Sequence, residues 1–155
     1  MKVINGDILT PNGDENKIII VCHQVNCMGV MGAGLALQIK NKFPDVYEQY
    51  KSRCKMIKKG IGGLGDVQYC STKSGYIIAN IFSQYNYGYK VCHTDYIALK
   101  NAFSYIAYYY PNATIRIPYR IGCGLAGGDW NIVKKIIEES LIANNIDVEI
   151  WKFDK

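Results

Sequence analysis

Two continuous runs of apolar residues limit the folds open to this chain. Residues 18–21 are Ile-Ile-Ile-Val, and residues 75–82 form a second run, Gly-Tyr-Ile-Ile-Ala-Asn-Ile-Phe. Runs without polar alternation predict strands that are buried on both faces, as in parallel sheets covered by helices. A sheet of this kind needs helical segments between its strands.

The rest of the chain supplies such segments in alternation. Thr94 is the expected N-cap of a helix that we predict at residues 95–109. The alternation predicts one domain, residues 1–155, with an α/β fold: a three-layer α/β/α sandwich around a mixed, largely parallel sheet. Hydrophobic periodicity and Gly/Pro punctuation predict strands at residues 3–5, 17–23, 66–70, 75–82, 113–118 and 147–153, and helices at 33–43, 45–56, 95–109 and 131–143.

Composition narrows the classes of function. The 155 residues are 49% hydrophobic, which suits a compact domain with its own core. No run approaches the roughly 20 apolar residues of a membrane span, and the N-terminus does not resemble a signal peptide, so we expect no membrane association. Six scattered cysteines without a Cys-x-x-Cys pair favour reduced thiols in the cytoplasm and disfavour a zinc site. We expect neither a metal nor a cofactor.

The formal net charge of +5 comes from basic residues spread along the chain. A modest positive field helps to collect an anionic nucleotide. Without a basic stripe or a nucleic-acid-binding motif, a nucleic-acid partner is not expected. The lysine-, isoleucine- and asparagine-rich composition is typical of a low-GC bacterial or phage genome.

A glycine-rich loop at residues 121–130 follows a predicted strand and precedes a predicted helix. Its glycines are Gly122, Gly124, Gly127 and Gly128, which let backbone amides approach a ligand closely. A glycine-rich turn that enters a helix N-terminus presents unpaired N–H groups and the positive end of the helix dipole. The loop therefore predicts an anion-binding site.

A second glycine-containing loop, residues 23–34, follows the first buried strand. It matches neither the dinucleotide-binding fingerprint nor the P-loop. Either it is a strand-to-helix turn, or it is a ligand loop in which the Asn26 amide bonds sugar hydroxyls; the residues leave both open. Ligands of such sheets bind beyond the carboxyl ends of the strands, where both loops are expected.

Five segments then resemble the macro domain family, most of all its branch that processes ADP-ribose-1″-phosphate. The similarity runs through nearly the whole chain in the family's order. The segments are GDIL at residues 6–9, HQVNCMGVMGAGLA at 23–36, GLGDVQ at 63–68, IANIFSQ at 78–84 and IGCGLAGGDW at 121–130.

The resemblance implies an ADP-ribose cleft at the carboxyl edge of the sheet. Asp7 would bond the adenine amino group with Ile8 beside it, and Trp151 would flank the adenine, with Phe153 as the alternative. The first loop would line the distal ribose and diphosphate with Asn26, Gly32, Ala33 and Gly34. Ser83 and Gln84 would lie near the distal ribose, and the second diphosphate loop would comprise Gly122, Cys123, Gly124, Leu125, Ala126 and Gly127.

The candidate catalytic residues are His23 and Asp129. In a small eukaryotic phosphatase of the family, a histidine at the position of His23 is thought to be catalytic, and an imidazole is a suitable general acid or base near neutral pH. His23 equally suits a buried structural role. Asp129 either positions a water or caps the last long helix. For Cys123, packing is favoured over a nucleophilic role.

Two functions follow from the resemblance. The first is hydrolysis of an ADP-ribose derivative, as an ADP-ribose-1″-phosphate phosphatase or an ADP-ribosyl hydrolase. The second is a binding module that recognises or sequesters ADP-ribose, an ADP-ribosylated macromolecule or a cyclic ADP-ribose signal. The second is motivated by a departure from a related glycohydrolase: its lysine falls here on Ser83 or Gln84, and its aspartate on Ala126.

Overall fold

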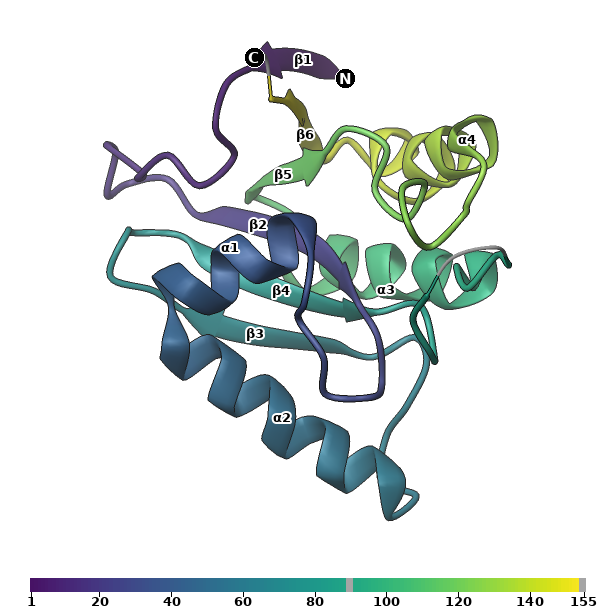
Figure 1. The fold of residues 1–155 in the computed structure, drawn as a ribbon. Helices are drawn as coiled ribbons and strands as arrows, with labels where there is room; N and C mark the ends of the chain where they lie inside the picture. Colours follow the sequence, from purple (N-terminus) through teal and green to yellow (C-terminus); the bar gives the residue numbers. More distant parts are fainter. Residues whose placement is uncertain (89–90, 154–155) are drawn as a thin grey trace.

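The computed structural model describes residues 1–88 and 91–153. Pairs of strands and helices come first along the chain, and single strands and helices alternate in the C-terminal part (Figure 1). They are β1 (Lys2–Asn5), β2 (Ile19–Val25), α1 (Gly34–Lys42), α2 (Pro44–Lys58), β3 (Val67–Ser71), β4 (Ile77–Phe82), α3 (Tyr96–Tyr109), β5 (Thr114–Pro118), α4 (Trp130–Ser140), a short 3-10 helix η1 (Ile142–Asn144) and β6 (Asp147–Lys152).

The strands form one sheet in the order β1-β6-β5-β2-β4-β3. All neighbouring strands are parallel except β3, which runs antiparallel to β4 at the edge. Helices α1 and α2 cover one face of the sheet, and α3 and α4 cover the other (Figure 1). The predicted α/β fold with a mixed, largely parallel sheet is confirmed.

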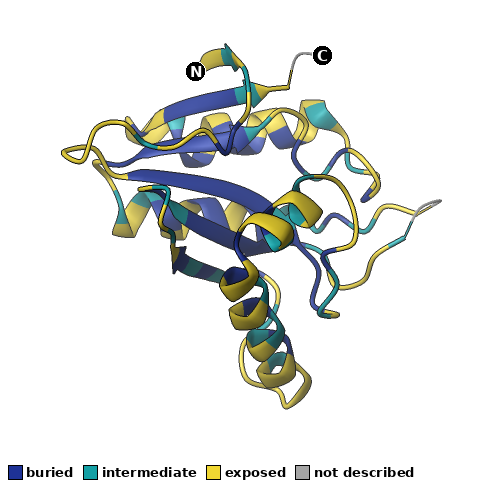
Figure 2. Ribbon diagram, turned by 60° about the vertical axis from the view of Figure 1, so that its left-hand side comes forward, coloured by how far each residue is buried: buried dark blue, intermediate teal, exposed yellow. Residues whose placement is uncertain are grey.

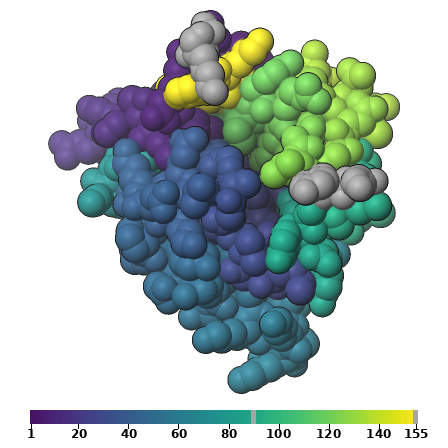
Figure 3. Space-filling model, in the orientation of Figure 1, coloured from purple at the N-terminus to yellow at the C-terminus, as the bar shows by residue number. Residues whose placement is uncertain are grey.

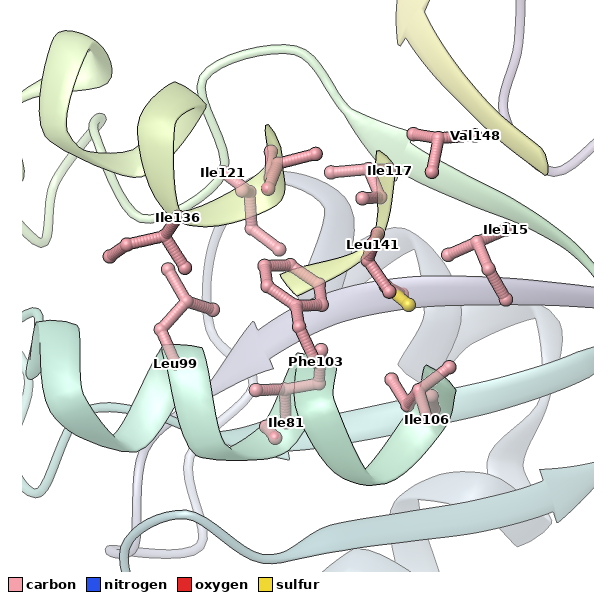
Figure 4. Packing of buried hydrophobic residues seen from close by; sticks show 14 of the residues in the cluster. Ile81, Leu99, Phe103, Ile106, Ile115, Ile117, Ile121, Ile136, Leu141 and Val148 are labelled. Carbon is pink, nitrogen blue, oxygen red and sulfur yellow. The ribbon is translucent and has the colours of Figure 1, made fainter. Parts of the chain in front are cut away.

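The larger part of the core lies between the sheet and the pair α3 and α4. Figure 4 shows Leu99 of α3 directed toward Ile136 of α4, and the Phe103 ring directed toward Leu141 at the end of α4. Ile81 of β4 and the isoleucines of β5 belong to the same cluster. In β2, Ile20 belongs to this core while Val21 belongs to the core under α1, and both are fully buried. The prediction of a strand buried on both faces is confirmed, and Figure 2 shows the central strands of the sheet in the colour of buried residues.

The predicted N-cap of α3 is wrong by one residue. Asp95, not Thr94, caps the helix: its carboxylate accepts a hydrogen bond of 2.9 Å from the amide of Ala98. The Thr94 hydroxyl instead donates to the carbonyl oxygen of Gly122 at 2.6 Å. A long-range partner has thus taken the side chain that local capping preference would assign to the helix.

Within residues 1–88 and 91–153, no helix combines the length and the apolarity that a bilayer span requires.

Candidate functional site

A continuous cleft crosses the carboxyl ends of the parallel strands. It consists of three adjoining hollows, which we call the Asn26 hollow (about 350 Å³), the central hollow (about 250 Å³) and the Trp151 hollow (about 370 Å³). The Asn26 and central hollows share Gln24 and Leu125, and the central and Trp151 hollows share Leu35 and Tyr119. In Figure 3 a depression lies between the blue surface of α1 and the green surface of the segment after β5.

The N-terminus of α1 borders the central hollow. Ala33, its N-cap, has an extended backbone and makes no side-chain capping bond, and Gly34 has a φ of 57°. Gly32 lines the neighbouring Asn26 hollow. The first amides of a helix have no partner within the helix and, with the helix dipole, favour an anion. The loop of residues 23–34 therefore does more than connect a strand to a helix, since it opens an uncapped helix onto a cleft.

The glycine-rich loop lines the same hollow. Gly122 has a φ of 72°, and its carbonyl accepts bonds from the Thr94 hydroxyl and from the amide of Gly128, the latter at 2.9 Å. Gly124 and Leu125 are exposed there. In the part of the chain that the structure describes, the amides of residues 124–126 donate to no protein acceptor. They are available to a ligand in the cleft.

The Trp151 hollow is lined by residues at the carboxyl ends of β1 and β6. Asp7 is exposed on its wall, and its carboxylate also accepts the amide of Leu9 at 2.9 Å. The Trp151 indole donates to Glu149 at 3.1 Å, which fixes the plane of the ring. Ile8 lies beside Asp7 and is 7% exposed. These three predicted residues, Asp7, Ile8 and Trp151, are brought together in one hollow.

Arg116 supports this hollow from beneath, and sequence reasoning missed it. Its guanidinium lies 4.8 Å from the centre of the Trp151 ring and donates to the carbonyls of Ile8 and Thr10 at 2.9 and 2.6 Å. Burial lowers the pKa of Arg116, and the nearby Glu149 carboxylate opposes that shift. A charged residue in the middle of an apolar strand, Thr-Ile-Arg-Ile-Pro, was the available signal.

His23 lies on the wall of the central hollow but is only 2% exposed. Its Nε2 is hydrogen-bonded to Asn80 Oδ1. Because Asn80 Nδ2 already donates to Gln68 at 3.0 Å, its oxygen accepts, and His23 Nε2 carries the proton. Nδ1 then has a free lone pair and meets no partner among the described residues. Burial lowers the His23 pKa to about 4, so the ring is neutral at pH 7.

Asn26 is engaged mainly in holding its own loop. Its Oδ1 accepts from the amide of Met28 at 2.9 Å and from the Tyr50 hydroxyl at 2.7 Å. Its Nδ2 donates to the carbonyl of Val30 at 2.8 Å. One N–H of the amide is left for a ligand in the Asn26 hollow. Asn26 can therefore donate a single hydrogen bond to the predicted pair of sugar hydroxyls.

Four predicted site residues do not line any of the three hollows. Ser83 is fully buried and donates to Gln24 at 2.6 Å. Cys123 packs in the core, where burial raises the pKa of its thiol to about 11, and this supports the packing interpretation. Gly127 has a φ of 76° and lies against the chain at Cys92. Asp129 caps α4, accepting from the amide of Asn131 at 2.8 Å, so the predicted cap is confirmed.

Gln24 joins the three loops of the site and was also missed. Its Nε2 donates to Gln84 at 2.8 Å and to the Thr94 hydroxyl at 3.0 Å, while its Oε1 accepts from Ser83. Gln84 and Ala126 both line the Asn26 hollow and the central hollow. Tyr87, at 52% exposure, forms the outer wall of the Asn26 hollow.

Residues 1–88 and 91–153 contain no group of three or more His, Cys, Asp or Glu side chains arranged to hold a metal ion.

Comparison with known proteins identifies relatives of similar length and relatives that are longer. No protein-family model matches the chain. An uncharacterized 17.5 kDa protein of Enterobacteria phage T4 is 29% identical, with 98% of this chain and 97% of that protein covered. A DNA ADP-ribosyl glycohydrolase of Thermus aquaticus is 27% identical over 99% of this chain, which spans 41% of that protein. An ADP-ribose 1″-phosphate phosphatase of Meyerozyma guilliermondii is 33% identical over 41% of this chain and 35% of its own length.

Solved structures repeat the fold over the whole chain. A protein of unknown function from Bacteroides thetaiotaomicron has a TM-score of 0.86 at 28% identity, covering 98% of this chain and 97% of its own. A macrodomain protein from Streptomyces coelicolor has a TM-score of 0.82 at 23% identity, with 99% of both chains covered. Thermosipho africanus DarTG, solved in complex with ADP-ribose, has a TM-score of 0.76 at 23% identity, covering 97% of this chain and 40% of its own.

Related macrodomains bind ADP-ribose, and some are named as hydrolases. The chain has the macrodomain fold, and its sequence is similar along nearly its whole length to proteins that are 27–29% identical to it.

Proposed function

We propose that this chain binds ADP-ribose, free or attached to a macromolecule, along the cleft. The observation that carries the proposal is the central hollow, which is lined both by the uncapped first turn of α1 and by the residues 124–126 whose amides are unpaired. Amides at a helix N-terminus together with those of a glycine-rich loop suit a diphosphate. The related structure with bound ADP-ribose supports this ligand.

The two ends of the cleft suit the two ends of that ligand. In the Trp151 hollow, the Asp7 carboxylate would accept from the adenine amino group while the Trp151 ring flanks the base. In the Asn26 hollow, the remaining side-chain N–H groups of Asn26 and Gln84 would bond the distal ribose. The central hollow, which adjoins both, would hold the diphosphate.

Calorimetry with ADP-ribose tests the binding proposal. The wild type is expected to bind, and Gly124→Glu is expected to abolish binding, because a carboxylate would enter the anion site. Gly13→Glu is the matched control: both glycines are exposed, and at both positions a Cβ atom would meet nothing within 4 Å. Absence of wild-type binding would refute the proposal, as would unchanged binding by Gly124→Glu.

We further propose that the bound group is hydrolysed at its distal ribose, either at an ADP-ribosyl bond or at a 1″-phosphate. The glycohydrolase and phosphatase relatives support this reaction class. His23 supports it too, because its neutral Nδ1 is free to accept a proton from water while Asn80 holds Nε2. The role requires a water molecule to reach this buried nitrogen when substrate is bound.

Chromatography of an ADP-ribosylated substrate, together with phosphate release from ADP-ribose-1″-phosphate, tests the reaction. Turnover by the wild type that is lost in His23→Gln, with ADP-ribose binding retained, is the expected result. Unchanged turnover in His23→Gln would remove the residue from the mechanism.

The competing function is a binding module without turnover. It is favoured by the Asn26 hollow, because no Asp, Glu, His, Lys, Arg or Cys side chain is found among the described residues that line it. A leaving group there would meet amides and a tyrosine but no ready acid. Tight ADP-ribose binding without product from any of the substrates above would establish this alternative, and cyclic ADP-ribose would then be the next ligand to titrate.

A further inference from the structure

A tight turn connects β5 to the glycine-rich loop. The amide of Ile121 donates to the carbonyl of Pro118 at 3.0 Å, so residues 118–121 form a β-turn. Arg120, its third residue, has a φ of 63°, whereas Tyr119 before it has a negative φ. This is the pattern of a type II turn, whose third position favours glycine because a side chain there lies close to the following carbonyl oxygen.

The chain places glycine at neighbouring positions of this kind but not at residue 120. Gly122 and Gly127 have φ values of 72° and 76° in the loop that follows. Among residues 1–88 and 91–153, the only non-glycine residues with positive φ are Arg120 and Asn145, and asparagine tolerates the left-handed region well. Arg120 is therefore the unusual residue of the pair.

Packing and pairing within the described chain do not account for this arginine. Arg120 is exposed, and its guanidinium makes no ion pair or hydrogen bond with a described residue. A residue kept in a left-handed conformation against its backbone preference, at the edge of a site, points to a role in that site.

Arg120 lines the central hollow, and among the described residues of that hollow it is the one with a charged side chain. The other described residues of the hollow are glycines, apolar side chains, Tyr119, the amides Gln24 and Gln84, and the neutral ring of His23. The amides of residues 124–126 and the N-terminus of α1 make the same hollow suitable for an anion. A guanidinium adds two parallel N–H donors that match the oxygens of a phosphate.

We propose that Arg120 binds the diphosphate of the ligand and that the protein gives up backbone stability to keep an arginine at this turn position. This inference rests on the proposed ADP-ribose binding and adds to it a side-chain cation that neither the motifs nor the relatives assign. Binding and stability then respond to a substitution in opposite directions, which a merely structural residue would not do.

Arg120→Gly is the test, with ADP-ribose as the probe. We expect its dissociation constant to rise by about tenfold, since a hydrogen bond to a charged group is lost, and its dependence on salt to weaken. We expect the midpoint of thermal unfolding to rise by about 2–4 °C, because glycine relieves the left-handed backbone. Arg120→Lys, which keeps the charge but not the paired donors, should bind with intermediate affinity.

Two control variants separate the loss of the Arg120 guanidinium from the change of backbone conformation and from the loss of a positive charge elsewhere. Asn145→Gly makes the same change at the other left-handed position, in the C-cap of η1, and should leave ADP-ribose affinity unchanged. Arg53→Ala removes a positive charge at a separate hollow beside Asp66 and should also leave affinity unchanged.

Each failure has its own meaning. If the wild type does not bind ADP-ribose, the proposed function fails. If the wild type binds and Arg120→Gly binds equally well, the role of Arg120 alone is refuted. If Arg120→Gly is less stable than the wild type, the stability cost of this turn position is refuted.

Discussion

Thr94 Oγ1 donates a hydrogen bond of 2.6 Å to the carbonyl oxygen of Gly122 and accepts one of 3.0 Å from Gln24 Nε2. The two bonds connect the end of β2, the start of α3 and the glycine-rich loop through one buried hydroxyl. The amide of His93 adds a bond of 2.7 Å to the carbonyl of Ala126. The conformation that leaves the amides of residues 124–126 unpaired is thus held by residues far away in the sequence.

Thr94→Val is expected to weaken ADP-ribose binding although Thr94 lines none of the three hollows. Valine keeps the shape of threonine but removes the donor to Gly122, so the glycine-rich loop loses one of the long-range hydrogen bonds that anchor it. The affinity should fall by about 2- to 10-fold, the worth of one ordinary hydrogen bond, and Thr94→Ser should restore it. Calorimetry measures both.

Thr72→Val is the matched control for this prediction. The Thr72 hydroxyl makes the same kind of bond, 2.7 Å to the carbonyl of Tyr76, in the turn between β3 and β4. It should lower stability by a similar amount without changing affinity. Equal affinities of Thr94→Val and the wild type would contradict the anchoring role of Thr94.

Substitution by alanine should change the stability differently at two glycines of the same loop. A Cβ atom on Gly128 would lie 2.5 Å from the carbonyl oxygen of Gly122, a backbone atom that cannot yield without moving the loop. A Cβ atom on Gly124 would meet nothing within 4 Å. Urea unfolding should show a loss of about 1–3 kcal/mol for Gly128→Ala and little change for Gly124→Ala. Similar losses for both would mean that the loop rearranges freely.

Asp129 was predicted both as a catalytic residue and as a helix cap, and one substitution distinguishes the roles. Asp129→Ala should cost about 1 kcal/mol of stability through loss of the α4 cap, as Asp95→Ala should at α3, where an aspartate also caps the helix. Because Asp129 does not line the cleft, turnover should be unaffected. A large loss of turnover in Asp129→Ala alone would instead indicate direct participation.

The layers of this fold could be predicted from sequence because the apolar runs are long and unbroken. The ends of strands could not, since they are set by partners rather than by composition. β2 ends at Val25, two residues beyond its predicted end, because Gln24 and Val25 pair with Ile81 and Phe82 of β4. The edge strand β3 and its antiparallel direction likewise depend on a partner.

The candidate site, like the fold, could be predicted in its general position but not in all of its residues. Loops that follow parallel strands meet at one edge, so residues 23–34 and 121–130 could be placed in one cleft. Arg120 and Gln24 could not be found, because one acts through a turn conformation and the other through long-range contacts. Arg116 did leave a signal, the single charged residue of an apolar strand. Ser83, Cys123 and Gly127 were included because the resemblance carries over whole segments. Ser83 and Cys123 are buried, and Gly127 lies against the chain at Cys92 and not at the cleft.

His23 links the site to the pH dependence of stability. In the folded protein, burial holds its pKa at about 4, against an ordinary value of 6.5 in the unfolded chain. Between these values the unfolded chain binds the extra proton, so the free energy of unfolding falls as the pH is lowered through this window. Above pH 6.5 both states are neutral at His23, and its contribution to stability is fully present.

The wild type is therefore expected to lose about 2 kcal/mol more stability than His23→Gln when the pH is lowered from 7 to 5. Glutamine retains an amide donor for Asn80 but does not titrate, and the carboxylates common to both proteins cancel in the comparison. Urea unfolding at the two pH values provides the measurement. Parallel pH profiles for the two proteins would mean that the buried imidazole of His23 is protonated as easily in the folded protein as in the unfolded chain. The neutral ring on which the proposed proton acceptor Nδ1 depends would then be contradicted.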